Sequence, residues 1–141
     1  MTLLELLVAV AVAGLLAGLA LPGYRAQVMR AHRFEAMGAL LAVAEAQERH
    51  HLAEGRYAAW LADDAGRGDA PALALPARTT GGRYVLSITE ATPGRFRAVA
   101  RPLAGRGQDR DARCAEFAIE ATGRRSARDA EGRDTTPDCW R

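Results

Sequence analysis

The sequence opens with MTLLELLVAVAVAGLLAGLALP, residues 1–22, and the interpretation of the whole chain begins with these residues. It is apolar from Leu6 to Leu21, and it carries a single charge, Glu5. A helix of about 21 residues rises roughly 31 Å, which is about the thickness of the hydrocarbon core of a bilayer. Length and composition therefore favour a membrane-spanning helix, in which a lone carboxylate is costly unless it has a partner.

Two ordinary interpretations of this stretch leave residues unexplained. A secretory signal peptide needs basic residues before its apolar run and a small-residue cleavage site after it, and no Lys or Arg precedes this run. A plain transmembrane anchor is the leading interpretation on chemistry alone. It does not need Glu5, however, and it gains nothing from Gly14, Gly18 and Pro22, since glycine and proline weaken a helix.

The stretch resembles the N-terminus of a processed type IV pilin. Members of that family begin with Phe or Met, continue with Thr-Leu-(Ile/Leu)-Glu-Leu, and carry Gly at the fourteenth position and Pro at the twenty-second. The residues that match are Met1, Thr2, Leu3, Leu4, Glu5, Leu6, Gly14 and Pro22. Because no leader peptide ending in Gly is present, we interpret the chain as starting at its processed end.

The resemblance implies a structural subunit that is single-pass in the inner membrane before assembly and extracellular in the pilus fibre afterwards. It implies three kinds of partner: other pilins or copies of the same chain, a leader peptidase that also methylates Met1, and an inner-membrane assembly platform with its ATPase. We expect Glu5 to pair with the Met1 amino group of a neighbouring subunit, because each chain brings one charge of each sign to the dry filament core. We also expect Gly14, Gly18 and Pro22 to make the helix flexible.

The composition limits the classes of protein to which the chain can belong. The formal net charge of +2, with 26% charged residues, is too balanced to indicate a nucleic-acid-binding protein. The two cysteines, Cys114 and Cys139, predict a disulfide in an exported domain. It would close a loop of about 26 residues, worth roughly 3.5 kcal/mol in the chain-entropy model. The spacing excludes a CxxC redox site.

The residues after Pro22 predict a second helical segment from Tyr24 to about Ala53. Its apolar side chains recur with the spacing i, i+3, i+4, i+7 of an amphipathic helix (Met37, Leu40, Leu41 and Ala44). Gly55 is a suitable C-terminal stop. The sequence therefore divides into an apolar helix, residues 1–24, and a globular head, residues 25–141, whose first element continues the same helix.

The head is predicted to be a sheet packed on that helix. Residues 55–82 form a connecting region without strong periodicity, in which Tyr57, Trp60 and Leu61 would anchor it to the helix and a short helix near residues 58–63 is one option. Three stretches alternate polar and apolar residues as strands do: 83–89, 95–101 and 114–120. The fold class is α+β, a long helical spine on an antiparallel sheet of three or four strands spanning 83–120, followed by a polar loop within the disulfide-bounded segment 114–139.

The sequence contains no constellation that indicates catalysis. His32, His50 and His51 are interpreted as solvated helix residues, and Asp63, Asp64, Asp109 and Asp111 lack the spacing of a calcium loop. We therefore predict no enzymatic activity, no cofactor and no metal.

Within the pilin family, residues 30–56 and the ending Asp138-Cys139-Trp140 most resemble minor pilins, although one sequence does not separate major from minor roles. Adhesion, twitching motility, DNA uptake and secretion share this subunit design. The alternatives are a type II secretion pseudopilin and a membrane-anchored periplasmic binding module. The latter predicts salt-dependent DNA binding by residues 25–141. The outward arginines of residues 95–101 could contact DNA or a surface polyanion, but a solvated strand face is the simpler interpretation. The sequence therefore gives no support for nucleic acid as a partner.

Overall fold

The computed structural model describes residues 2–64 and 71–141, and its contacts divide the chain into two units, Met1–Ala31 and His32–Arg141. Helix α1 (Leu3–Glu54) contains both predicted helical segments from Leu3 onward and continues through Pro22. It ends where the glycine predicts, because Gly55 adopts a positive φ of 71° and its N–H donates to the carbonyl of His51 at 2.8 Å.

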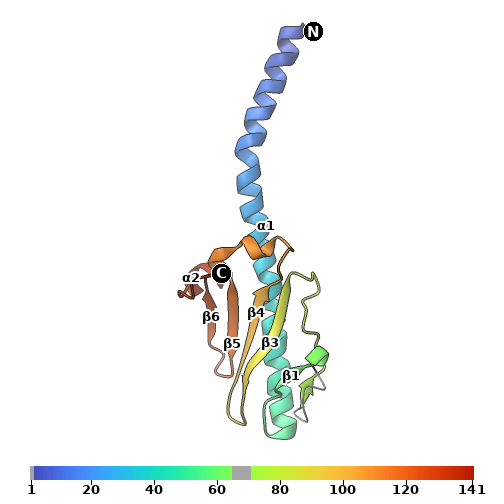
Figure 1. Ribbon diagram of the computed structural model, residues 1–141, viewed down its shortest axis with the longest axis vertical. Coiled ribbons are helices and arrows are strands. Elements are labelled where there is room, and N and C mark those ends of the chain that lie inside the picture. Colours follow the sequence, from blue (N-terminus) through green and yellow to red (C-terminus); the bar gives the residue numbers. More distant parts are fainter. Residues whose placement is uncertain (1, 65–70) are drawn as a thin grey trace. The chain divides into compact units, whose positions relative to one another are not determined.

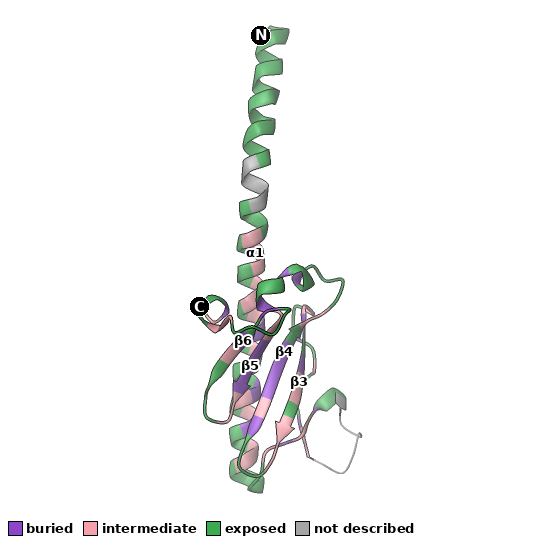
Figure 2. Ribbon diagram, turned by 60° about the vertical axis from the view of Figure 1, so that its left-hand side comes forward, coloured by how far each residue is buried: buried purple, intermediate pink, exposed green. Residues whose placement is uncertain are grey.

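The second unit has the predicted α+β architecture, a four-stranded antiparallel meander packed on the last part of α1 (Figure 1). The strands follow the order β3 (Tyr84–Ala91), β4 (Phe96–Pro102), β5 (Glu116–Glu120) and β6 (Arg125–Arg128). Alternate strand residues face α1, so that Tyr84, Phe96 and Phe117 are buried against Leu40 and Val43. Figure 2 shows this buried layer between helix and sheet.

Strand β6 corrects the sequence interpretation, which ended the sheet at residue 120 and left the following residues as a loop. The four residues of β6 pair with β5, with Phe117 opposite Ala127 and Glu116 opposite Arg128. Ala127 is the one buried residue of the strand. A strand this short and polar has no hydrophobic alternation to reveal it, and it forms because β5 offers it a register.

The connecting region also contains more regular structure than the sequence suggested. Strands β1 (Trp60–Leu61) and β2 (Ala72–Leu73) pair in parallel, and the expected short helix is a single 3-10 turn, Ala62–Asp64. The region is fixed to α1 by Gln47, which is fully buried. Its side-chain amide donates to the carbonyl of Ala58 and accepts from the N–H of the same residue, each at 2.8 Å.

The C-terminal segment closes the free edge of β6. The disulfide Cys114–Cys139 confirms the predicted pairing and joins two 3-10 turns, Gln108–Arg110 and Ala112–Cys114, to helix α2 (Thr136–Cys139). The N–H of Thr135 donates to the carbonyl of Ala127 at 2.9 Å, and the Trp140 indole donates to the carbonyl of Ser126 at 2.8 Å. The tail thus satisfies backbone groups that an edge strand would otherwise expose.

Glu35, a carboxylate on the spine helix that is bonded to Thr79 and Arg83, predicts that the stability of the head falls in acid. Burial raises the pKa of Glu35, but hydrogen bonds from Thr79 and Arg83 outweigh this effect and hold the pKa below its ordinary value of 4.5. A carboxyl whose pKa is lower in the folded state contributes its full stabilisation above the unfolded pKa, and that contribution disappears as the pH falls through the folded pKa.

We therefore expect the urea midpoint of the full chain in detergent to fall on acidification from about pH 5 to about pH 2. The variant Glu35→Gln should lower the midpoint at pH 7 and reduce this pH dependence. Glu45→Gln, which changes an exposed carboxylate, is the control and should leave the profile unchanged. Identical pH profiles for wild type and Glu35→Gln would show that Glu35 is not responsible.

Candidate functional site

The first unit presents an apolar helix with no cover of its own. Every residue of α1 from position 3 to position 18 is exposed (Figure 2). Among the described residues, α1 is the one helix that is long and apolar enough to cross a membrane. Exposing so much apolar surface to water is unfavourable, so this segment is expected to be surrounded by a bilayer or by other protein.

Glu5 lies in the first turn of this helix, where it has a local hydrogen-bonding role. Its carboxylate accepts from the N–H of Thr2, and the N–H of Glu5 donates to the Thr2 hydroxyl, each at 3.4 Å. This is the reciprocal arrangement of a capping box. Both contacts are long and exposed, and Met1, the other predicted assembly residue, lies outside the described residues.

The glycines of the apolar segment have no packing reason within the chain. A Cβ atom at Gly14 or Gly18 would meet no described atom within 4 Å. The backbone at Pro22 is helical, so the isolated chain has α-helix throughout the segment for which flexibility was predicted.

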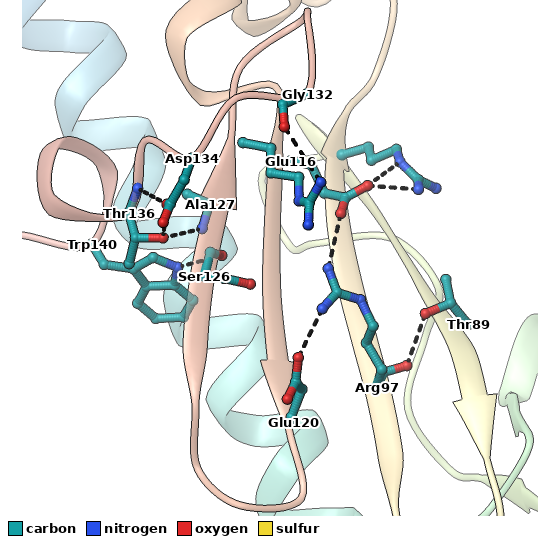
Figure 3. A network of polar contacts seen from close by, with 12 residues as sticks. Thr89, Arg97, Glu116, Glu120, Ser126, Ala127, Gly132, Asp134, Thr136 and Trp140 are labelled. Atoms are coloured by element: carbon teal, nitrogen blue, oxygen red, sulfur yellow. Dashed lines mark hydrogen bonds and ion pairs between the residues drawn. The ribbon is translucent and has the colours of Figure 1, made fainter.

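The outward arginines of the sheet, which the sequence offered as DNA contacts, are paired with acids. Arg97 lies between Glu120 at 2.9 Å and Glu116 at 3.2 Å, as Figure 3 shows, and Arg101 contacts Glu116 at 2.6 Å. Arg95 pairs with Glu90. These acids neutralise the positive charge of the three arginines, and the ion pairs cover Val99, which is 2% exposed. The outer face of β4 therefore carries an ion-pair network and offers no arginine without an acidic partner.

The arginines of β6 and the turn before it differ, because they keep their charge exposed. We call Arg124, Arg125 and Arg128 the arginine edge. Arg125 lies over the ring of Trp140 at 5.5 Å, and Arg128 donates to the carbonyl of Gly132 at 3.3 Å. No salt bridge joins the arginine edge to an acid within the described residues.

Asp134, an acid whose charge interacts with the arginine edge, is hydrogen-bonded to another residue. Hydrogen bonds from the side chain and backbone of Thr136 lower the pKa of Asp134, and the charges of Arg128 and Arg124 lower it further. Asp134 stays charged but is directed to Thr136, with which it forms contacts at 2.6 Å and 2.9 Å. The arginine edge therefore presents three exposed cations along one strand and its turn. Because side chains alternate along a strand, Arg125 lies on the side of Trp140 and Arg128 on the other side, opposite Glu116 in the register.

The comparison with protein families identifies the chain. The model of the family described as type IV minor pilin ComP, DNA uptake sequence receptor, matches residues 22–118, which is more than half of the chain. The chain belongs to this family.

A solved structure agrees with the fold of this minor pilin. The crystal structure of the Neisseria meningitidis non-core minor pilin PilV matches with a TM-score of 0.53 and 14% sequence identity, and the match covers 74% of this chain and 90% of that one. The long N-terminal helix and the antiparallel sheet are those of a pilin. No curated protein matches the chain.

Two groups of residues in this minor pilin correct the sequence interpretation. The histidines are not simply solvated: His51 contacts the carbonyl of Pro93 at 2.9 Å and stacks on Tyr57, and His32 contacts Gln108 at 3.3 Å. The arginine edge was missed as well. Its signal is the pair Arg124-Arg125 in a turn, and it could be recognised only once β6 was known to be a strand.

Proposed function

We propose that the chain is a minor subunit of a type IV pilus without enzymatic activity. Residues 1–24 hold it in the inner membrane before assembly and lie in the filament core afterwards, and residues 25–141 form the external head. The observation that supports this proposal is the continuous exposure of residues 3–18, in which Glu5 is the one charged residue. Once the helix leaves the bilayer, this surface must be buried again, and a bundle of pilin helices offers apolar cover along its whole length.

In this proposal, Glu5 and Met1 determine the axial position of each subunit relative to its neighbour. In a filament core both the carboxylate and the terminal amino group are nearly desolvated, and each unpaired charge costs several kcal/mol. Pairing Glu5 with the amino group of a neighbouring pilin removes both costs and fixes the axial position. The exposed Glu5 of the isolated chain keeps its carboxylate available for this exchange. A leader peptidase that methylates Met1 would leave the amino group able to carry its charge.

Gly14, Gly18 and Pro22 supply flexibility. Glycine weakens a helix, and Pro22 cannot donate a hydrogen bond to the residue four positions before it. We infer that this segment unwinds on assembly, which would let the heads adjust their positions. Continuous helix across these residues in a filament density map would contradict this inference.

Mass spectrometry of sheared surface filaments, combined with electron microscopy, tests the assignment. We expect this chain in trace amounts beside a major pilin, with a methylated residue at Met1. If the chain is the dominant band, it is a major pilin instead. Retention in the inner membrane, with no filament containing it, would overturn the proposal.

Reception of DNA by the arginine edge is a second candidate function. The family description names a DNA uptake sequence receptor. The arginines of the arginine edge are exposed and form no salt bridge within the described residues, so their charge is available to a phosphate backbone. This edge lies beyond residue 118, where the family match ends. DNA binding at the arginine edge is therefore supported by the charge and exposure of its side chains. The family description supports DNA as the class of ligand but does not support this location.

Replacing Arg124, Arg125 and Arg128 by glutamine should weaken binding to duplex DNA and make it less dependent on salt. Each lost phosphate contact reduces the slope of log affinity against log salt by about 0.9, so the triple variant should lose roughly 2 to 3 units of slope. Fluorescence anisotropy of labelled DNA with the full chain in detergent measures both quantities.

The matched control removes the same charge elsewhere. Arg49, Arg95 and Arg101 already pair with Glu45, Glu90 and Glu116, and their triple glutamine variant should keep most of the affinity and slope. Equal losses in the two triple variants would mean that total charge, rather than the arginine edge, determines binding.

A further inference from the structure

The connection between β4 and β5 carries two exposed arginines that have no acidic partner. It consists of residues 103–113, LAGRGQDRDAR, which we call the basic turn. Arg106 and Arg110 are both exposed, and neither guanidinium forms a hydrogen bond or an ion pair with the described residues. Arg113 differs, because it pairs with Asp138 at 3.1 Å. The basic turn therefore offers two cations to a partner outside the chain.

The two acids of the basic turn are held by other groups. The N–H of Gly105 donates to the Asp109 carboxylate at 2.9 Å, and this bond, with other backbone N–H groups of the turn, holds the pKa of Asp109 below its ordinary value of 3.8. The charge of Arg110 lowers this pKa further without forming an ion pair. Asp111 is bound by Arg33 at 2.7 Å. Neither carboxylate therefore occupies the two exposed guanidinium groups.

The basic turn packs on the first residues of the second unit. His32 contacts Gln108 at 3.3 Å, and Arg33 binds Asp111 at 2.7 Å. Along α1, His32 follows Pro22 by ten residues, and ten helical residues rise about 15 Å. With Pro22 at the edge of the hydrocarbon core, the headgroup layer takes up about 5–7 Å of this rise. The remaining 8–10 Å or so is about one Debye length at physiological salt, so the charges of the turn act on the headgroups.

The residues between the apolar run and the basic turn suit a membrane surface. Tyr24 is 69% exposed, and Arg25 and Arg30 are exposed as well. Tyrosine is enriched at the membrane–water interface, and arginine extends its charged end toward the headgroups. No acidic residue stands between Glu5 and Glu35 in the sequence. This part of the chain therefore repels no anionic lipid.

We propose that the basic turn binds the headgroups of anionic phospholipids while the chain is anchored in the inner membrane. The inference rests on the membrane stage of the proposed function and adds a contact made by the head. A guanidinium can donate two parallel hydrogen bonds to one phosphate group. The anchor holds the turn near the surface, which raises the effective concentration of lipid, so two arginines are enough for binding.

Lipid is favoured over DNA at the basic turn by the position of the turn in the chain. The turn precedes β5 and packs on the part of α1 that follows the apolar segment. Arg124 and Arg125 of the arginine edge instead follow β5, beyond its other end. DNA at the basic turn is thus the competing outcome of the test.

Hydrogen exchange of the full chain reconstituted in vesicles tests this contact. One set of vesicles contains phosphatidylcholine alone, and the other contains about 30% phosphatidylglycerol. We expect the amides of residues 103–113 to exchange at least about threefold more slowly in the anionic vesicles, and this difference to vanish in about 0.5 M salt, because salt screens the contact. The turn between β3 and β4, residues 92–95, should exchange equally in both.

Replacing Arg106 and Arg110 by glutamine should abolish the lipid-dependent slowing. Because neither guanidinium has a partner within the described residues, exchange in phosphatidylcholine vesicles and the melting temperature in detergent should equal those of the wild type. The matched control, Arg49→Gln/Arg56→Gln, removes two exposed arginines from and beyond the last turns of α1 and should keep the slowing.

Equal exchange of residues 103–113 in the two kinds of vesicle would overturn the inference. Flotation of the vesicles measures insertion separately, so the pilus assignment stands if the chain floats. If the chain floats with neither kind, the membrane stage of the proposed function falls together with the inference. Free glycerol phosphate should not slow the exchange. Slowing by glycerol phosphate, or stronger slowing by duplex DNA than by anionic vesicles, would also refute the assignment to lipid.

Discussion

Glu5→Val is expected to leave the amount of chain in the membrane unchanged and to lower the amount in fibres by about a hundredfold. Valine keeps the helix apolar, so insertion into the bilayer loses nothing. The amino group of the neighbouring subunit, however, then enters a dry layer without its partner. A buried ion left alone costs about 3–5 kcal/mol, and 3 kcal/mol already corresponds to more than a hundredfold change.

The capping box between Thr2 and Glu5 offers a competing explanation that two further variants separate. Glutamine can replace glutamate in a capping box but carries no charge, so Glu5→Gln keeps the cap and loses the ion pair. Thr2→Ala does the reverse. If the ion pair drives assembly, Glu5→Gln fails and Thr2→Ala assembles.

Immunoblots of sheared-fibre and membrane fractions measure the outcome of all three substitutions. Normal assembly of Glu5→Val would refute the pairing. Assembly of Glu5→Gln together with failure of Thr2→Ala would assign the role of Glu5 to the helix cap.

Asp111→Ala is expected to destabilise the head by about 3–5 kcal/mol, because it leaves Arg33 without its partner. The Arg33 guanidinium donates to both oxygens of Asp111, at 2.7 Å and 2.9 Å, and the two side chains are 15% and 4% exposed. Gln108, itself buried, donates to the same carboxylate at 3.1 Å. The pair fixes the connection between β4 and β5 to the spine helix.

Urea denaturation of the full chain in detergent, followed by near-ultraviolet circular dichroism, measures this loss. The double variant Arg33→Met/Asp111→Leu replaces both charges by apolar groups and should recover most of the stability, since a buried ion pair and an apolar pair are often equivalent. A loss below about 1 kcal/mol for Asp111→Ala would place the pair among surface ion pairs. Failure of the double variant to recover would indicate that packing matters more than charge.

The spine helix, the fold class and the family resemblance could be predicted from the sequence alone. An apolar run with one carboxylate, followed by an amphipathic repeat and Gly55, is a local pattern, and local patterns specify helices. The alternation around Phe96 and Phe117 predicted two strands for the same reason. The two cysteines sufficed for the disulfide because no third cysteine competes for pairing.

Which polar residues have partners became clear from the tertiary structure and not from the sequence. Arg97 and Arg101 looked as available as Arg124 and Arg125 until the strand register placed Glu116 and Glu120 beside them. Arg95 also has its partner, Glu90, in the neighbouring strand β3. Strand β6 likewise required its neighbour, because four polar residues carry no periodic signal.

Non-local contacts explain the rest of what the sequence did not reveal. Gln47 and Ala58 are joined across a loop, and Arg33 and Asp111 are 78 residues apart. Whether such a polar residue is buried and paired depends on chain segments that meet only in the fold, whereas a helix repeats its own pattern every turn.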